Sequence, residues 1–231
     1  MIGKKVGIIC AGDREVAPVL RYLEKASISE KAMLKVHEGT INGVHVAALY
    51  SGVCKVNAAV ATQILIDTYG CEIIINAGTA GGMDEKLKIF DTVVSEEVAY
   101  HDVGAGILTE FHPWLESIYF KADEALLALA RKTAEKFGAE NKVAFGRMVT
   151  GEKFIEDNRR DHINDKFSPL SVDMETGSVA HVCYVNKIPF ISIRTITDTA
   201  DHSGQKEFEK NCDIASEISA EFVKCMLGEM K

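Results

Sequence analysis

Short β-branched runs alternate with helix-patterned segments along almost the whole chain, and this alternation constrains the fold more than any other feature. The first strand is expected at residues 6–10, and a helical pattern follows through residues 16–23. Residues 73–76 form a continuous apolar run, which is typical of a strand covered on both faces. The alternation predicts an α/β protein with a largely parallel central sheet and helices on both of its faces.

The remaining elements continue this pattern. Residues 33–37 and 44–50 flank Asn42-Gly43, a strong signal for a hairpin with a type I′ turn, and this hairpin makes the sheet mixed. The charged segment 156–166 is expected to be an exposed, solvated helix. Further strands are expected at residues 92–98, 142–149, 171–173 and 190–196, and further helices at residues 55–69, 123–137, 176–186 and around 208–226.

Composition excludes several classes of function. The 231 residues are 47% apolar and 26% charged, and no polar linker or repeat divides them, so residues 1–231 are expected to form one domain. A formal net charge of -8 disfavours binding to nucleic acid or to an anionic membrane. No apolar run reaches the roughly 18 residues of a membrane helix. The six cysteines contain no C-x-x-C pair, which favours reduced thiols in a cytoplasmic protein and no zinc site.

Glycine-rich and polar residues follow several of the expected strands, at the edge where open α/β sheets bind ligands. The segment 76–82 (Asn-Ala-Gly-Thr-Ala-Gly-Gly) lacks the G-x-G-x-x-G fingerprint of dinucleotide-binding proteins and the Lys-Ser/Thr pair of a P-loop. It is therefore compatible either with a tight turn or with close approach of the backbone to a ligand.

Three acidic residues, Glu15, Glu175 and Asp198, are more informative because each follows an expected strand and should lie near one crevice. One carboxylate can accept hydrogen bonds from both hydroxyls of a ribose, and a carboxyl shielded from water can act as a general acid. Another carboxylate can activate water. Together they could cleave an N-glycosidic bond, by analogy with O-glycoside hydrolysis. From position alone, helix caps or surface carboxylates remain the alternative interpretation.

Short motifs along the chain narrow this choice. They are Val-Gly-Ile-Ile at 6–9 with Glu15-Val16, Ser-Gly-Val-Cys-Lys-Val at 51–56, the glycine-rich segment 76–82, Val-Asp-Met-Glu at 172–175, His-Val-Cys at 181–183 and Arg-Thr-Ile-Thr-Asp at 194–198. In this order and spacing, the chain resembles the methylthioadenosine/S-adenosylhomocysteine nucleosidases of the nucleoside phosphorylase superfamily. The resemblance implies a single-domain, three-layer α/β/α sandwich with a mixed sheet. It also implies hydrolysis of the adenine–ribose bond with water, no metal or organic cofactor, and a homodimer that serves methionine salvage.

The resemblance also implies roles for individual residues. Asp198 is similar to the general acid that protonates adenine N7, Glu15 to the carboxylate that activates water, and Glu175 to the residue that holds the ribose hydroxyls. The other implied substrate contacts are Thr79 and Arg194 beside Glu15, Thr197 near the base, Met174 against the sugar, Phe154 and Ile155 at adenine, and Val53 and Phe208 at the 5′ alkylthio end.

Departures from the family pattern keep the substrate open. Residues 103–114 replace an aromatic loop that in relatives reaches the neighbouring subunit's pocket. Phe111, Pro113 or Trp114 could substitute for the aromatic residues of that loop. In addition, Gly12 stands where many relatives carry Met. Another 5′-modified adenosine, such as aminodeoxyfutalosine, is therefore an alternative substrate.

Two further functions remain as alternatives. A purine nucleoside phosphorylase would need arginines for phosphate, whereas the site after the first strand offers Glu15, which favours water. A noncatalytic nucleoside-binding protein would need a ribose clamp but neither an acid nor a water-activating carboxylate. His101-Asp102 could form a catalytic dyad, but structure within the long connection 101–121 is the favoured interpretation.

Overall fold

The computed structural model of the chain describes residues 3–104, 106–111, 115–137, 142–156, 159–201 and 204–230. The strands are β1 (Val6–Cys10), β2 (Glu24–Lys31), β3 (Leu34–Ile41), β4 (Val44–Tyr50), β5 (Ile73–Gly82), β6 (Thr92–Tyr100), β7 (Phe120–Lys121), β8 (Val143–Thr150), β9 (Ser171–Asp173) and β10 (Phe190–Asp198). The helices are α1 (Asp13–Leu20), α2 (Lys55–Asp67), α3 (Ile107–Glu110), α4 (Glu124–Ala134), α5 (Arg160–Phe167), α6 (Thr176–Asn186) and α7 (Gln205–Gly228).

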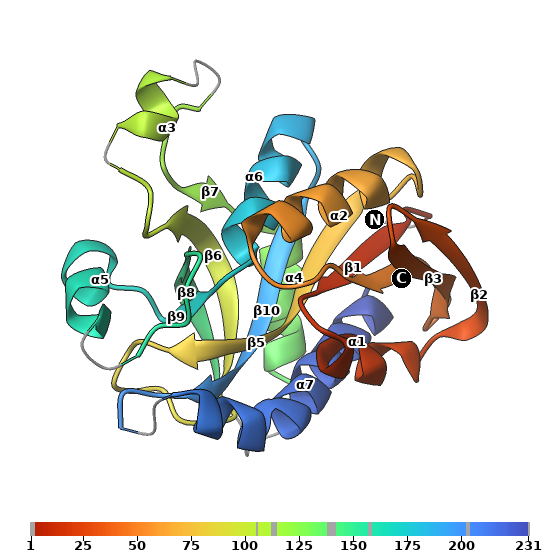
Figure 1. Cartoon of the computed structure of the whole chain (residues 1–231). Helices are drawn as coiled ribbons and strands as arrows, with labels where there is room; N and C mark the ends of the chain where they lie inside the picture. The colour runs from red at the N-terminus through yellow and green to blue at the C-terminus, as the bar shows by residue number, and fades with distance from the viewer. Residues whose placement is uncertain are drawn as a thin grey trace.

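The sheet lies between two layers of helices (Figure 1). Helices α1, α4 and α7 cover one face, where Ile8 and Ile75 pack with Phe222. Helices α2 and α6 cover the other face, where Ile74 packs with Leu65 and Val179. The predicted α/β/α sandwich with a mixed sheet is confirmed. Among the described helices, none is long and apolar enough to cross a membrane.

Pairing between β5 and β10 brings the two strands of the predicted site together. The strand order is β10-β6-β8-β9-β5-β1-β4-β3-β2, and the additional β10–β5 pairing closes five of these strands into a ring. In the parallel β10–β5 ladder, Arg194 lies opposite Gly78 and Asp198 opposite Gly81. The sequence did not predict this closure, because pairing between strands more than 100 positions apart leaves no local signal.

The first part of the chain departs from the prediction in one strand. Helix α1 ends at Leu20, and β2 follows and pairs antiparallel with β3. Strand β2 is exposed along its whole length and rich in charged residues, so it lacks the apolar alternation by which strands are predicted. The hairpin turn is confirmed, since Asn42 and Gly43 have φ values of 51° and 80°, as a type I′ turn requires.

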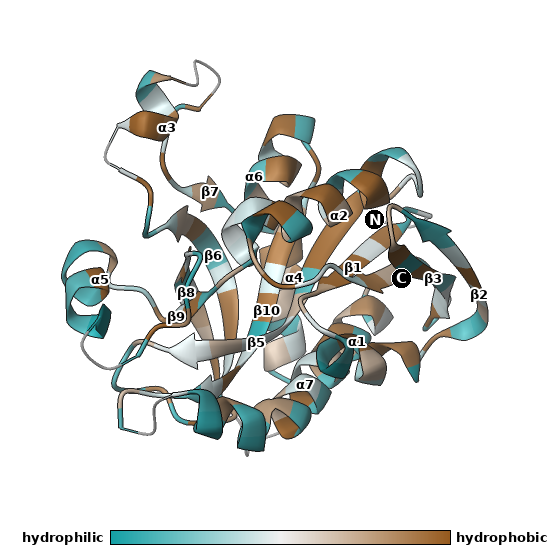
Figure 2. Cartoon of the chain, viewed as in Figure 1, coloured by the Kyte–Doolittle hydropathy of each residue, from teal (hydrophilic) through white to brown (hydrophobic). Residues whose placement is uncertain are grey.

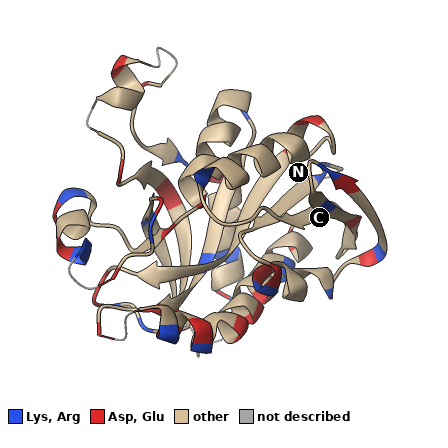
Figure 3. Cartoon of the chain, viewed as in Figure 1, with Lys and Arg blue, Asp and Glu red and all other residues tan. Residues whose placement is uncertain are grey.

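Two predicted segments differ in ways that matter for the site. Strand β5 continues to Gly82, so the glycine-rich segment belongs to a strand and the tight-turn interpretation is wrong. Helix α5 is exposed along one face, as predicted for the charged segment 156–166, but its other face buries Arg160, Ile163 and Phe167. Figure 2 shows the apolar residues concentrated in the central strands, and Figure 3 shows most charged residues on outer elements such as α5, α7 and β2.

Candidate active site

A cavity of about 570 Å³ lies where β1, β5, β9 and β10 end, and this volume suits a small-molecule ligand. Every predicted site residue except Arg194 lines it: Glu15, Val53, Thr79, Phe154, Ile155, Met174, Glu175, Thr197, Asp198 and Phe208. Seven separate stretches of the chain supply these residues, so the fold assembles a site that is scattered in the sequence.

Glu15 is held mainly by backbone N–H groups. Its Oε2 accepts hydrogen bonds from the backbone of Ala11 at 2.7 Å and Gly12 at 3.2 Å. Its Oε1 accepts from the backbone N–H of Thr79 at 2.7 Å and from the Thr79 hydroxyl at 2.8 Å. A carboxylate has about four acceptor positions. Donors from the β1–α1 turn and from β5 therefore fix the position and orientation of the Glu15 carboxyl group.

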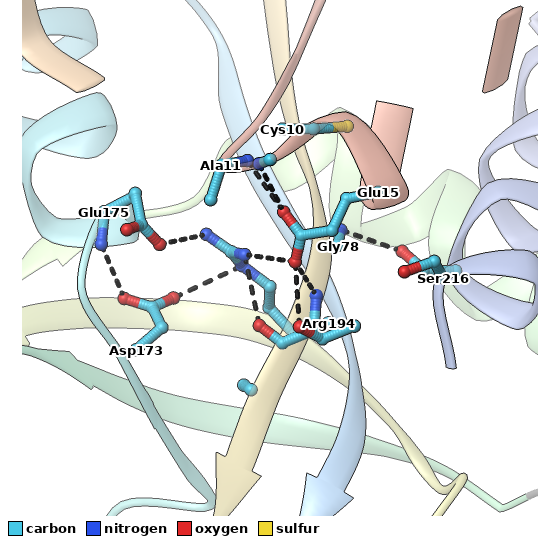
Figure 4. A network of polar contacts seen from close by, with 12 residues as sticks. Cys10, Ala11, Glu15, Gly78, Asp173, Glu175, Arg194 and Ser216 are labelled. Carbon is cyan, nitrogen blue, oxygen red and sulfur yellow. Dashed lines mark hydrogen bonds and ion pairs between the residues drawn. The ribbon is translucent and has the colours of Figure 1, made fainter. Parts of the chain in front are cut away.

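The Arg194 guanidinium lies beneath the cavity and holds three carboxylates. It is fully buried, and its nitrogens lie 3.3 Å from Asp173, 3.5 Å from Glu175 and 3.7 Å from Glu15. Figure 4 shows the guanidinium between Glu15 on one side and Asp173 and Glu175 on the other. Arg194 therefore reaches the cavity through these carboxylates and does not line it itself. One cation among three carboxylates leaves this cluster with excess negative charge.

Glu175 is the carboxylate most affected by this charge. It is buried at the start of α6, and its Oε1 accepts a hydrogen bond from the Cys54 backbone at 2.9 Å. Burial raises the pKa of Glu175 to about 7; the charge of Asp173 adds to this rise, while Arg194 opposes it. Cys54 reaches Glu175 with a φ of 80°, a conformation that non-glycine residues rarely adopt and that marks local strain at the site.

Asp198 is held by side chains. Its Oδ1 accepts a hydrogen bond from the Thr197 hydroxyl at 2.9 Å, and its Oδ2 accepts one from Arg160 Nη2 at 2.8 Å. Burial raises the pKa of Asp198, although both hydrogen-bond partners and the charge of Arg160 act to lower it. A buried carboxyl with a raised pKa that faces a cavity is suited to proton donation.

Two glycines of β5 make room for these carboxylates. A Cβ atom at Gly78, whose φ is 145°, would lie 2.5 Å from Glu15 Oε1, so a side chain at this position would displace this carboxylate. A Cβ atom at Gly81 would lie 3.2 Å from Asp198 Oδ2. The glycine-rich segment thus lets the backbone of a strand approach both acidic groups closely.

Apolar side chains form the other wall of the cavity. Phe154 and Phe208 meet edge to face with ring centroids 6.1 Å apart. Phe154 is 38% and Val53 is 51% exposed, whereas Ile155 is buried. Exposed aromatic and aliphatic groups that line a cavity are favourable contacts for a flat base or an apolar substituent.

Comparisons with known proteins show the family to which the chain belongs. The sequence profile of the phosphorylase superfamily matches residues 5–227. A 5′-methylthioadenosine/S-adenosylhomocysteine nucleosidase from Bacillus cereus is 38% identical over 98% of this chain and 100% of the relative. The chain belongs to this nucleosidase family of the phosphorylase superfamily.

Solved structures show the same fold. The nucleosidase of this family from Colwellia psychrerythraea, in complex with adenine, superposes with a TM-score of 0.90 at 34% identity and covers 99% of this chain and 96% of its own. A futalosine hydrolase from Helicobacter pylori gives a TM-score of 0.89 at 27% identity, with 98% of each chain covered. The fold therefore accommodates nucleosidases named for different substrates.

Sequence reasoning assigned no role to three polar residues that contact the predicted site residues. Asn76 accepts hydrogen bonds through Oδ1 from Thr176 at 2.7 Å and from Arg194 at 2.9 Å. Asp173 pairs with Arg194, and its place two residues before Glu175 was the available signal. Arg160 had no signal, because it stands in a run of charged residues.

The long connection between β6 and β7 was the other open question. Asp102 pairs with Lys55 at 2.6 Å and accepts a hydrogen bond from the Glu152 backbone at 2.9 Å, which fits a role in loop structure. Phe111 is 73% exposed, and Pro113 and Trp114 lie outside the described residues. Among the described residues, no cluster of His, Cys, Asp and Glu side chains could hold a metal ion.

Proposed function

We propose that this chain hydrolyses the N-glycosidic bond of 5′-methylthioadenosine and S-adenosylhomocysteine, releasing adenine and the corresponding thioribose. The observation that carries the proposal is the convergence of Glu15, Glu175 and Asp198 on one cavity. The family membership and the 34% identity to a structure that contains adenine support it. The roles below are proposals for the individual side chains.

Asp198 is the general acid. As the bond between C1′ and N9 breaks, its electron pair moves into the purine ring, and Asp198 donates its proton to N7. The leaving group is then neutral adenine. The raised pKa of Asp198 keeps part of the enzyme in the protonated, active form at higher pH than a solvated aspartate would.

Glu15 activates water, and Glu175 holds the ribose. Water adds to C1′ and gives its proton to Glu15, with the Thr79 hydroxyl 2.8 Å from the same carboxylate. The ribose hydroxyls donate to Glu175. Positive charge develops on the sugar in the transition state, and the carboxylates around Arg194 stabilise it because they carry more negative charge than this one guanidinium neutralises.

The apolar wall receives the rest of the substrate. Adenine packs on Phe154 with its edge at the Ile155 backbone, and the sugar lies against Met174. The 5′ alkylthio group lies between Val53 and Phe208, and Thr197 stands near the base beside Asp198. These placements are the ones that the resemblance to the nucleosidases implies, and the cavity lining supports them because it includes all of these residues.

Hydrolysis is favoured over phosphorolysis because the arginines near the cavity already have acidic partners. Arg14 pairs with Glu209 at 3.0 Å and Asp213 at 2.6 Å. Arg160 pairs with Asp198 at 2.8 Å, and Arg194 contacts three carboxylates. A phosphate would have to displace one of these partners.

We also propose that the protein is a homodimer in the cytoplasm. Helices α2 and α6 pack against each other and leave Val56, Val60 and Val185 74%, 45% and 46% exposed. Exposed apolar groups of this kind mark interfaces. All six cysteines are free, as in a reducing compartment. Light scattering after size-exclusion chromatography tests the dimer, and a monomeric mass would contradict it.

The test of the function is adenine release from methylthioadenosine with and without phosphate, with chromatography of the sugar product. We expect phosphate-independent release and free methylthioribose. A strict phosphate requirement with a sugar 1-phosphate product would instead assign the chain to the phosphorylases. The same assay with S-adenosylhomocysteine and with aminodeoxyfutalosine shows which 5′ substituent the enzyme prefers. Residues 103–114 depart from the family pattern and do not identify that preference.

A further inference from the structure

Arg160, the first residue of α5, is a buried cation directly behind the proposed acid. Its side chain is 3% exposed, and Nη2 lies 2.8 Å from Asp198 Oδ2. Its Nη1 donates to the Gly82 carbonyl oxygen and lies 3.6 Å from Met83 Sδ. Arg160 does not line the cavity, so it contacts the reaction only through Asp198.

Burying a guanidinium is unfavourable unless a partner compensates its charge. Within the described residues, Arg160 forms one ion pair, and that pair is with Asp198. Its Nε is buried with no hydrogen-bond partner among the described residues, so the guanidinium is not placed for maximal hydrogen bonding. The contact with Asp198 is therefore the main electrostatic compensation for its burial.

We propose that Arg160 is the positioning residue of the general acid: it holds Oδ2, keeps the transferable proton on Oδ1, and stabilises the carboxylate that remains after transfer. This inference rests on the proposed role of Asp198. An oxygen that accepts from a guanidinium is a poor site for a proton, because the cation repels it. The proton then lies on Oδ1, the oxygen that also contacts Thr197.

The consequence for the chemical step is direct. The Oδ1–H bond breaks, the N7–H bond forms, and the C1′–N9 electron pair moves into the purine, so Asp198 becomes a carboxylate. Arg160 then neutralises this new charge at 2.8 Å. An acid whose conjugate base is stabilised donates more readily, and solvent returns the proton after the products leave.

The other charged groups around Asp198 are acidic or more distant. Those that line the cavity are Lys153 and Glu156 before α5, Asp13, Arg14 and Glu15 on α1, Glu209 on α7, and Asp173 and Glu175. Glu207 on α7 and the buried Arg194 lie outside this lining. Of the described cations, Arg160 alone lies within 4 Å of the Asp198 carboxylate. Its removal therefore changes the charge next to the acid without changing the lining of the cavity.

The test is the pH profile of kcat/KM for methylthioadenosine in wild type and in Arg160→Gln, Arg160→Lys and Arg159→Gln. Asp198 must be protonated, so kcat/KM falls as the pH rises through its pKa. Loss of the neighbouring cation raises that pKa, and we expect this alkaline limb to move up by roughly 1–3 pH units in Arg160→Gln. The rate below the limb should fall on the order of tenfold, because the acid is weaker.

Two variants separate this role from a structural one. Arg160→Lys keeps the charge and should keep the alkaline limb near that of wild type. Arg159→Gln makes the same change at the adjacent exposed position and should match wild type throughout. If Arg160→Gln lost rate while its alkaline limb stayed in place, or if Arg159→Gln moved the limb equally, the inference would be overturned.

A second measurement does not depend on turnover. In protein labelled with ¹³C-aspartate, the carboxyl resonance missing from Asp198→Asn identifies Asp198, and its titration midpoint should rise in Arg160→Gln. An unchanged midpoint would contradict the inference even if the enzyme were active. A raised midpoint in a protein that releases no adenine would show that Arg160 lowers the pKa of Asp198 but would overturn the proposed function, and with it the role of Arg160 in catalysis.

Discussion

The two acidic groups proposed for the chemistry are held by different kinds of partner. Glu15 receives three of its four hydrogen bonds from backbone N–H groups, of Ala11, Gly12 and Thr79. Among the described residues, Asp198 receives hydrogen bonds from two side chains, those of Thr197 and Arg160. Backbone donors remain when a neighbouring residue is substituted, whereas side-chain donors are lost. The water-activating site should therefore be robust to neighbouring substitutions and the acid site sensitive to them.

The largest expected effect comes from Asp198→Asn, which removes the proton donor. We expect turnover of methylthioadenosine to fall by about 10²–10⁴-fold, the usual contribution of a general acid. Because asparagine has nearly the same size, the variant should still bind substrate, as isothermal titration calorimetry would measure. Wild-type turnover in this variant would show that another group protonates the base.

Glu15→Gln should lose hydrolysis by about 10²-fold or more, because an amide cannot take the proton of water. The new NH₂ group also faces donors from Ala11, Gly12 and Thr79, so local rearrangement is expected. Rapid-quench measurement of adenine release in a single turnover isolates the chemical step. Retained hydrolysis with intact adenine binding would exclude Glu15 as the base.

Glu175→Gln should lower kcat/KM by about 10–100-fold, since a hydrogen bond to a charged group contributes roughly 1.5–3 kcal/mol. We expect kcat to fall as well as affinity, because the bonds to the ribose strengthen as positive charge develops on the sugar. Steady-state kinetics with methylthioadenosine measures both parameters. Unchanged kinetics would remove the ribose role.

A matched pair of threonine variants sharpens the comparison directly. Thr197→Val removes one of two donors to Asp198, and we expect a loss of about tenfold in kcat/KM. Thr79→Val removes the same hydroxyl from Glu15 but leaves three backbone donors, so the loss should be about threefold or less. Equal losses in the two variants would show that the kind of donor does not matter.

The smallest effect is on stability and concerns the cluster around Arg194. The folded-state pKa of Glu175, about 7, lies above its unfolded value of about 4.3. Its contribution to stability is therefore present at low pH and is lost as the pH rises through the folded-state pKa. A glutamine side chain does not ionise, so Glu175→Gln does not lose this stability. The Tm of the variant minus the Tm of wild type should therefore increase as the pH rises from 5 to 8.

Differential scanning calorimetry across this pH range measures the effect, and about 2–4 °C corresponds to each kcal/mol for a chain of this size. Asp213→Asn is the control. Asp213 is exposed, and the hydrogen bond with Arg14 lowers the pKa of its carboxyl, whereas the pKa of Glu175 is raised. A constant Tm difference for Glu175→Gln from pH 5 to pH 8 would argue against a raised pKa.

The sequence by itself determined most of the strands and helices in their order, and its resemblance to the nucleosidases implied most of the cavity lining. These features have local causes: β-branched runs, helical periodicity, the Asn42-Gly43 turn and polar residues at the ends of strands. Glu15, Glu175 and Asp198 were identifiable because each stands in a short motif. Strand β2 was missed because its exposed, charged residues carry no apolar pattern.

Only the tertiary structure decided how these groups are held. The pairing of β5 with β10 places Arg194 among three carboxylates, and it turns an expected glycine loop into a strand whose Gly78 and Gly81 give these carboxylates room. The burial of Arg160 against Asp198 joins segments 38 positions apart. Local patterns report which residues prefer a strand, a helix or water, but the charge that compensates a buried ion is chosen by packing between distant segments.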